Sequence, residues 1–197
     1  MFTGIVESMG VIDSITVTED GRRLTLFAPD VAPSLAHGES LSVDGVCLTV
    51  EAIDDEVVAV FLADETVRRT TLEDRSVDDA VNLERAMPAN GRFDGHLVQG
   101  HVDTTTSITA IDEIGEDWRF SFALPSAYSP YIVEKGSITI DGISLTIASQ
   151  STDSFDVAII PTTYDQTTLK DRKIGDDVNI EVDIIAKYVE SMLEERR

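Results

Sequence analysis

The sequence predicts an all-β protein with two similar halves and one C-terminal helix. Short segments alternate apolar or β-branched residues with polar ones, and turn signals follow at intervals of about ten residues. That spacing is typical of sandwiches and small barrels. The segments of the first half return in the second half, and helical periodicity is confined to the end of the chain.

The chain carries a long internal repeat. SLSVDGVCLTV at 40–50 returns as SITIDGISLTI at 137–147, and TVRRTTLEDR at 66–75 returns as TYDQTTLKDR at 163–172. From Asp44 to Asn82 the first half aligns without gaps, at an offset of 97 residues, with the stretch from Asp141 to Asn179. A repeat this long indicates a duplicated domain. We expect one domain at 1–97, a second at 98–183 and a helix at 184–197.

The elements follow from local patterns. Strands are expected at 22–29, 40–50 and 56–63, and again at 118–125, 137–147 and 154–161; most end at a turn or a proline. An Asp-Gly dipeptide in each half favours a tight turn. A short helix is expected at 126–133. No linker rich in Pro or Gly separates the halves, so we expect them to pack closely.

The C-terminal helix is predicted from an apolar stripe at helical spacing. Asp183 precedes it as an N-cap. The stripe comprises Ile184, Ile185, Tyr188, Val189, Met192 and Leu193. It is wider than one barrel surface needs. We therefore predict that part of it packs against the same helix of neighbouring subunits and gives a trimer; the alternative is packing on its own barrel.

The composition excludes several classes of protein. Lys and Arg total 15 against 37 Asp and Glu, for a net charge of −22, which disfavours nucleic acid and anionic membranes as partners. Hydrophobic residues make up 42%, enough for a core. A single Cys favours a reducing compartment, and MFTGIVES does not resemble a signal peptide. These features predict a soluble cytoplasmic protein.

The acidic residues are spread along the whole chain. So large a charge destabilises the compact state unless salt screens it. We interpret it as adaptation to a high-salt cytoplasm; the alternative is a solvated acidic surface without functional meaning.

Two matched segments, DGVCLT and DGISLT, place small polar side chains in apolar strands. Alternation puts Cys47 and Thr49 on one face, and likewise Ser144 and Thr146. The residues are either small core residues of a tight barrel or a pair of related sites.

GHLVQGHVD at 95–103 holds two Gly–His pairs. His101 is suited to proton transfer near neutral pH, and the alternative is a structural histidine at a domain junction. His96, His101 and Asp103 lack zinc-site spacing, so no metal is expected. Lys135 breaks the internal symmetry, because its counterpart in the first half is Gly38.

Five motifs, taken together, resemble those of one protein family. The chain resembles the riboflavin synthase family of the alpha-chain type in MFTGIVE, DGVCLTV, ERAM followed by GHLVQGHVD, YIVEKGSITIDGISLTI and VNIEVDIIAKYVE. The match covers essentially the whole chain, in order. The resemblance implies two six-stranded Greek-key barrels and a C-terminal helix that assembles a homotrimer.

The resemblance also implies a reaction. Two molecules of 6,7-dimethyl-8-ribityllumazine are dismutated by transfer of a four-carbon unit, giving riboflavin and 5-amino-6-(D-ribitylamino)uracil. No cofactor or metal takes part. Each barrel binds one substrate, and the active site forms between the N-barrel of one subunit and the C-barrel of its neighbour.

Carried onto this sequence, the resemblance implies two pockets. The N-barrel pocket would use Gly4, Ile5, Val6, Cys47, Leu48, Thr49, Ala63, Asp64, Glu65, Thr66, Val67 and Arg68. The C-barrel pocket would use Gly100, His101, Val102, Lys135, Ser144, Leu145, Thr146, Ile160, Pro161, Thr162, Thr163, Tyr164 and Asp165. The chain departs from the family at Thr104, where Gly is frequent, and in IPTTYD, where Glu commonly precedes the second Thr.

The roles are hypotheses. His101 is the candidate base or proton shuttle, while Ser144, Cys47 and Thr146 would polarise the substrate or activate water. A non-catalytic lumazine or flavin carrier of the same fold is the main alternative, and a generic duplicated binding module is the weaker one. Intact DG-x-x-LT segments and GHLVQGHVD favour the enzyme.

Overall fold

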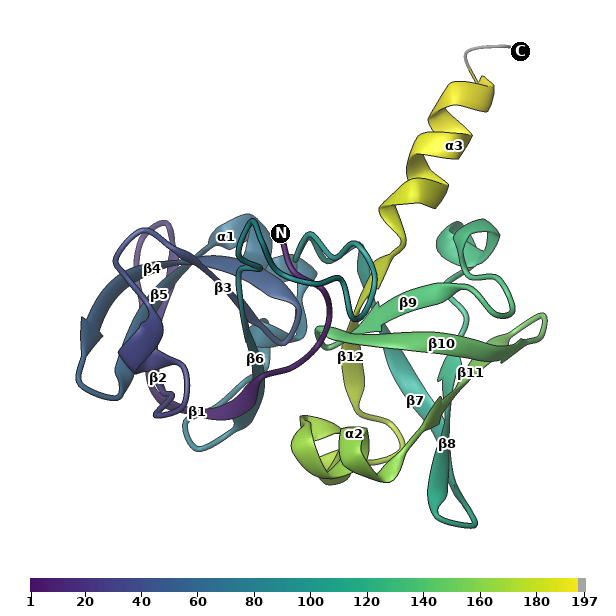
Figure 1. Cartoon of the computed structure of the whole chain (residues 1–197), viewed down its shortest axis with the longest axis horizontal. Coiled ribbons are helices and arrows are strands. Elements are labelled where there is room, and N and C mark those ends of the chain that lie inside the picture. The colour runs from purple at the N-terminus through teal and green to yellow at the C-terminus, as the bar shows by residue number, and fades with distance from the viewer. Residues whose placement is uncertain (195–197) are drawn as a thin grey trace.

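Two closed six-stranded antiparallel barrels lie side by side in the computed structural model, which describes residues 1–194 (Figure 1). The first consists of β1 (Ser8–Val17), β2 (Gly21–Phe27), β3 (Ser40–Val43), β4 (Val46–Asp54), β5 (Val57–Ala63) and β6 (Ala80–Arg85). The second consists of β7 (Thr104–Ile114), β8 (Asp117–Ala123), β9 (Ser137–Ile140), β10 (Ile143–Gln150), β11 (Ser154–Ile159) and β12 (Asp177–Val182). The predicted all-β fold with two similar barrels is confirmed.

The barrels share one Greek-key topology. Around the first, the strand order is β1-β2-β5-β4-β3-β6, and the second repeats it with each number raised by six. The irregularities repeat too: a bulge follows Val50 in β4 and Ile147 in β10. Bulges bend strands and help to close a barrel. The duplication therefore extends to the details of strand curvature.

Short helices cover the barrels at equivalent places. The α-helices α1 (Asp64–Arg69) and α2 (Pro161–Gln166) follow β5 and β11, and each leads into a 3-10 turn, η2 (Thr71–Glu73) or η4 (Thr168–Asp171). Further 3-10 turns are η1 (Ala32–Ser34) and η3 (Ser126–Tyr131). The helix expected at 126–133 is thus a 3-10 helix ending at Tyr131. Pro130 lies inside it and lacks the N–H that an α-helix interior needs.

Each barrel has its own apolar core. In β4, Val46, Leu48 and Val50 point inward and are buried, while Thr49 is exposed and Cys47 is half-buried. The same alternation in β10 buries Ile143, Leu145 and Ile147. Cys47 and Ser144 therefore lie on the outer faces of their barrels. Their alternative interpretation as small core residues is wrong.

The barrels meet at the Asp-Gly turns of β3–β4 and β9–β10. Gly45 and Gly142 have φ of +80° and +82°, the left-handed region that favours glycine. A Cβ on Gly45 would lie 2.7 Å from the backbone nitrogen of Gly142, and one on Gly142 would lie 2.8 Å from that of Gly45. Only glycine at both positions permits this approach.

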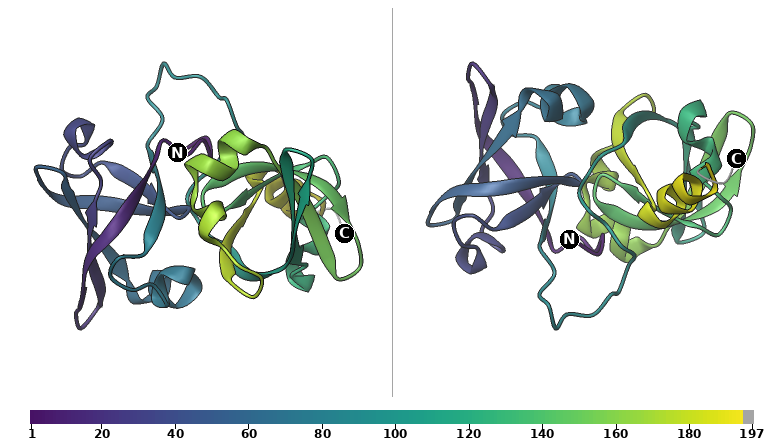
Figure 2. Two further views of the ribbon diagram at one scale, coloured as in Figure 1. Left: turned by 90° about the horizontal axis from the view of Figure 1, so that it is seen from below. Right: turned by 90° about the horizontal axis from the view of Figure 1, so that it is seen from above.

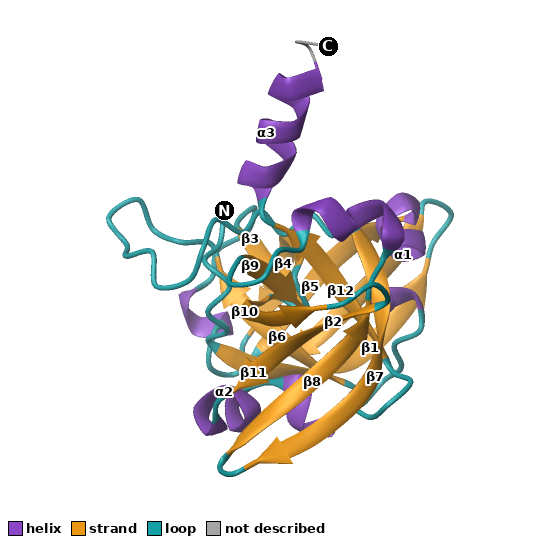
Figure 3. Cartoon of the chain, turned by 90° about the vertical axis from the view of Figure 1, so that its right-hand side faces the viewer, coloured by secondary structure: helices purple, strands orange, loops and turns teal. Residues whose placement is uncertain are grey.

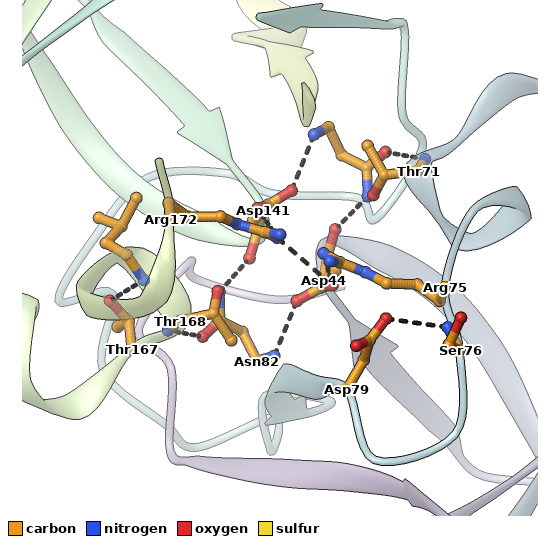
Figure 4. A network of polar contacts seen from close by, with 12 residues as sticks. Asp44, Thr71, Arg75, Ser76, Asp79, Asn82, Asp141, Thr167, Thr168 and Arg172 are labelled. Carbon is orange, nitrogen blue, oxygen red and sulfur yellow. Dashed lines mark hydrogen bonds and ion pairs between the residues drawn. The ribbon is translucent and has the colours of Figure 1, made fainter. Parts of the chain in front are cut away.

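Two asparagines form hydrogen bonds from one barrel to the other, and Figure 4 shows Asn82 beside Asp141. The Asn82 amide donates to the backbone oxygen of Asp141 at 2.9 Å, and the Asn179 amide donates to that of Asp44 at 2.9 Å. Their side-chain oxygens accept the backbone N–H of Thr168 and Thr71, respectively. The close packing expected from the sequence is confirmed, and it has approximate two-fold symmetry.

A buried charge cluster lies beside the asparagines. Asp44 and Asp141 are fully buried; Arg75 bonds Asp44 at 2.7 Å, and Arg172 bonds Asp141 and lies 3.9 Å from Asp44. Burial, followed by the charge of Asp141, raises the pKa of Asp44, and the two guanidinium groups oppose the shift. The arginines thus stabilise carboxylates that would otherwise repel each other.

The connection between the barrels, 86–103, runs as an extended loop outside both (Figure 2). Its end pairs with the start of the chain: Phe2 and Val98 form an antiparallel bridge, and the His96 N–H donates to the Thr3 oxygen at 3.1 Å. No helix among residues 1–194 is long and apolar enough to cross a membrane.

Helix α3 (Ile184–Glu194) projects away from both barrels (Figure 3). Asp183 caps it by accepting the Ile185 N–H at 2.9 Å, as predicted. Lys187 pairs with Asp103 at 2.6 Å, and Glu190 accepts the Tyr131 hydroxyl. Residues 195–197 of the predicted helical segment lie outside the described residues.

The apolar stripe of α3 is not covered by its own barrel. More than half of each side chain is exposed at Ile185, Tyr188, Val189, Met192 and Leu193. Packing of this stripe on its own barrel, one of the two alternatives, is therefore wrong.

Stability should increase with salt concentration. The acidic side chains gather at exposed places such as the β7–β8 hairpin, where Asp112, Glu113, Glu116 and Asp117 are all exposed. Screening weakens their mutual repulsion, so Tm should rise between about 0.1 and 2 M KCl. Calorimetry at fixed pH measures this, and a flat or falling Tm would contradict it.

Candidate active site

A cavity of about 150 Å³ opens on the outer face of the first barrel at Cys47. Val46 and Cys47 of β4 form one wall, and Glu65, Thr66 and Arg69 of α1, with Thr70, form another. The third wall is Gly100, His101 and Val102, from the connection to the second barrel. The cavity thus combines apolar surface with a thiol, a hydroxyl, an imidazole and charged groups.

The third wall is held by close backbone contact. The Cys47 N–H donates to the Gly100 oxygen at 2.8 Å, and a Cβ on Gly100 would lie 2.6 Å from that of Cys47. Gly100 has φ of +78°. Glycine is needed here both for the conformation and for the approach.

The same contact is built at the second barrel by the start of the chain. The Ser144 N–H donates to the Gly4 oxygen at 2.7 Å, and a Cβ on Gly4 would lie 2.6 Å from that of Ser144. Val6 packs against the core of the second barrel, and Val102 packs against the core of the first. Each repeat therefore contributes its opening residues to the barrel of the other repeat.

A glutamate anchors each crossing segment. Glu84 of β6 accepts the N–H groups of Thr3 and Gly4, while Glu181 of β12 accepts those of Gln99, Gly100 and His101. Burial raises the pKa of both carboxyls, and the hydrogen bonds from the N–H groups oppose the shift. Each glutamate belongs to the same repeat as its segment, so the segment leaves from its own barrel and reaches the other.

This exchange corrects the grouping expected from the sequence. Gly100, His101 and Val102 lie with Cys47 and not with Ser144, whereas Gly4 lies with Ser144 and not with Cys47. Linear order assigned each segment to its own repeat, but the segment before β1 or β7 crosses the two-fold contact. Cys47 and His101 face one cavity, so substitutions at the two should affect the same binding site.

The other residues expected at the sites occupy the same outer faces. Thr49 and Thr146 are exposed on β4 and β10, whereas Leu48 and Leu145 point into the cores. Leu48 and Leu145 therefore support the sites from beneath. Ile5, which follows Gly4, is exposed on the surface.

The segments 63–68 and 160–165 form α1 and α2 with the residues that cap them. Ala63 and Ile160 are the N-caps, and both are exposed. In α1, Val67 is buried, whereas Asp64, Glu65 and Arg68 are exposed. The helix offers polar groups on one side and is held by its apolar residue on the other.

In α2 the counterpart of Val67 is Tyr164. Its ring stacks on Trp118 of β8 with centroids 3.8 Å apart and planes at 6°. Of the remaining residues, Pro161 and Thr163 are half-buried, and Thr162 and Asp165 are exposed. The two helices are thus fixed by different packing.

Lys135 lies apart from the cavity at Cys47. It is exposed in the turn before β9, has φ of +66°, and donates its N–H to the Ile147 oxygen. Its counterpart Gly38 has φ of +86° and makes the same bond to Val50. The turn is shared, and only the charge differs.

Sequence reasoning missed the role of His96. Its Nδ1 lies 2.7 Å from the Ser144 Oγ, and its Nε2 lies 3.2 Å from the Thr139 Oγ1. From the sequence, His96 was considered as a metal ligand, that role was rejected, and no other was assigned. Within residues 1–194, no group of three or more His, Cys, Asp or Glu side chains is placed to hold a metal ion.

The chain matches known proteins over almost its full length. A family model described as the lumazine binding domain matches residues 3–86 and again residues 99–183. The riboflavin synthase of Mycobacterium tuberculosis is 44% identical over 199 residues, with 98% of each chain covered. That of Bacillus subtilis is 41% identical over 189 residues, covering 96% of this chain and 88% of the relative. The chain belongs to the riboflavin synthase family.

Solved structures agree with this family fold. LumP complexed with 6,7-dimethyl-8-(1'-D-ribityl) lumazine has a TM-score of 0.84 at 26% identity. LumP complexed with riboflavin has a TM-score of 0.86 at 28% identity; each match covers 92% of this chain and 99% of LumP. Identity to the riboflavin synthases is higher, and the chain is an enzyme.

Proposed function

We propose that the chain dismutates two molecules of 6,7-dimethyl-8-ribityllumazine. A four-carbon unit passes from one molecule to the other and yields riboflavin and 5-amino-6-(D-ribitylamino)uracil. The observation that carries this proposal is the pair of exchanged contacts, Gly100 on Cys47 beside a cavity and Gly4 on Ser144 at the equivalent place of the second barrel. Two related sites suit a reaction between two copies of one molecule, and their different side chains suit different roles.

Positioning supplies most of the rate. Holding two reactants in register can contribute about 7–11 kcal/mol. The crossing segments, α1 and α2 fix the edges of each lumazine, and the hydroxyl, thiol and imidazole groups reach its polar atoms. We propose that His101, at the rim of the Cys47 cavity, accepts or passes on the methyl proton. Cys47, Ser144 and Thr146 polarise the ring or hold a water molecule.

The reaction takes place in the cytoplasm of a cell with high internal salt. The single cysteine and the charge of −22 support this part of the proposal. We propose that the reaction uses no cofactor and no metal.

A direct assay tests the function. The purified protein is incubated with 6,7-dimethyl-8-ribityllumazine, and riboflavin absorbance is followed with the uracil product by chromatography. We expect one riboflavin for every two lumazines consumed. A protein that binds lumazine, as judged by fluorescence titration, but leaves it unconverted would be a carrier, and the proposal would fail.

The enzyme is proposed to be a homotrimer with its active site shared between the N-barrel of one subunit and the C-barrel of the next. The uncovered stripe of α3 supports assembly through this helix, because five of its apolar side chains are more than half exposed. Domains of 1–97 and 98–183, with 184–197 as the assembly segment, fit this proposal.

Deleting residues 184–197 should therefore give a lower oligomer that has lost most activity, because neighbouring barrels no longer meet. Light scattering measures the mass, and the riboflavin assay measures the activity. As a control, Ile114→Ser removes an exposed apolar residue from the β7–β8 hairpin and should change neither. An unchanged trimer after the deletion would show that α3 is not the assembly element.

A further inference from the structure

His96 is enclosed at the Ser144 site by three elements. Its ring lies between Ser144 of β10 and Thr139 of β9, at 2.7 and 3.2 Å, and its backbone N–H donates to Thr3. Gly95 allows this path, since a Cβ there would lie 2.0 Å from the Thr3 oxygen. The connection between the barrels is thereby held against the serine.

With two hydroxyl partners, the imidazole can form both of its hydrogen bonds in either tautomer. A neutral imidazole has one N–H donor and one acceptor nitrogen, and each hydroxyl can donate or accept. When Nδ1 accepts a hydrogen bond from the Ser144 hydroxyl, the lone pairs of the Ser144 oxygen are free to accept a hydrogen bond from a ligand. When Nδ1–H donates, the Ser144 proton is free instead. The two states carry the same number of protons and differ only in which ring nitrogen bears the hydrogen and in the directions of the two hydroxyl groups.

The surroundings of the ring favour the neutral form that this requires. Burial lowers the pKa of His96, and the charge of Asp183, at the start of α3, opposes the shift. Thr139 is almost fully buried, so its hydroxyl has no access to bulk water.

The Cys47 site has no such partner. In the described part of the chain, the Cys47 sulfur has no hydrogen bond, and the side chain of His101 has none either. The crossing segments that hold Gly4 and Gly100 are otherwise equivalent. The two sites have matching backbone, and they differ in that only the Ser144 hydroxyl is hydrogen-bonded to an imidazole.

We propose that His96 is a positioning residue that sets the direction of the Ser144 hydroxyl and thereby gives the Ser144 site a different role from the Cys47 site. The inference rests on the proposed function. Ser144 then presents either its O–H or its oxygen lone pairs to the bound lumazine as a hydrogen-bonding partner, and His96 adopts the matching tautomer. Protonation of the ring blocks this exchange, because both nitrogens then donate.

The test combines three substitutions in the full-length protein. His96→Ala should lower kcat about tenfold near pH 8, the value of one net hydrogen bond, with little change in KM. His96→Asn, which can still bond Ser144, should recover most of the rate. In the wild type kcat should fall in acid, at pH values below the ordinary histidine pKa of 6.5, as the imidazole is protonated, and this dependence should be absent in His96→Asn. The exposed His37 supplies a matched control, and His37→Asn should behave as wild type.

A double-substitution cycle separates positioning from general structural support. If His96 acts through Ser144, His96→Ala should cause no further loss in a Ser144→Ala background. A full additional loss there, or wild-type kcat and pH dependence in His96→Ala, would overturn the inference. If the wild type forms no riboflavin, the proposed function fails on its own. Riboflavin affinity is then measured in the same cycle, where non-additive losses support the His96 role and additive losses refute it.

Discussion

Gly100→Ala should abolish most riboflavin formation. The new methyl group would lie 2.6 Å from the Cys47 Cβ, so the crossing segment must move away from the first barrel. The bond between the Gly100 oxygen and the Cys47 N–H would break, and His101 would shift with it. A displacement of about 1 Å in a positioned group can cost about 100-fold in rate, and we expect a loss of at least that size.

Two matched substitutions isolate the cause. Gly115 also has a left-handed φ, +69°, but nothing lies within 4 Å of its Cβ position, so Gly115→Ala adds the backbone strain without the clash. It should keep wild-type activity. Gly4→Ala repeats the clash at Ser144 and should lose activity as Gly100→Ala does. Full activity in a folded Gly100→Ala protein, checked by circular dichroism, would remove the crossing segment from the site.

Arg172→Leu should have the largest effect on stability. It leaves Asp141 without its cation and Asp44 with only Arg75, and both carboxylates are fully buried. Breaking a buried pair costs about 3–5 kcal/mol. At roughly 2–4 °C per kcal/mol for a chain of this size, Tm should fall by about 10 °C. Arg23→Leu breaks an exposed pair with Glu51 and should change Tm by far less.

The loss of stability caused by Arg172→Leu should be smaller at acidic pH. The folded-state pKa of Asp44 is already raised, and removal of a cation raises it further. A carboxyl whose pKa is raised in the folded state destabilises the protein at pH values above that pKa. This penalty decreases as pH falls from the folded-state pKa towards the unfolded-state pKa. The Tm difference between Arg172→Leu and wild type should therefore be smaller at pH 5 than at pH 7. A difference independent of pH would show that packing, not charge, causes the loss.

The sequence predicted the fold well because the duplication and the alternation are local signals. The cap at Asp183, the shared face of Cys47 and Thr49, and the close packing of the halves all follow from spacing or composition, whereas the outward direction of that face came from the structure. The helix at 126–133 was less accurate, since Pro130 limits it to a 3-10 form.

The exchange of segments could not be predicted, because it depends on tertiary contact. Nothing near Gly100 in the sequence indicates that its oxygen pairs with Cys47, more than 50 positions earlier. His96 was missed for the same reason: its partner Ser144 is distant in sequence and close in space. The sequence signal was the first glycine–histidine pair, Gly95–His96, which lies between the two repeats and has no counterpart in either.

The crossing segments also bear on what one repeat can do alone. Each half lacks one wall of its own site and carries a wall for the other half, so a single repeat would be complete only as a two-fold dimer. The connection 86–103 replaces that encounter between two molecules with a contact inside one molecule, because covalent linkage raises the effective concentration of one half at the other. The chain is in this sense a covalently linked dimer of repeats. Because the two repeats are separate parts of one sequence, their two sites can carry different side chains, as at Cys47 and Ser144.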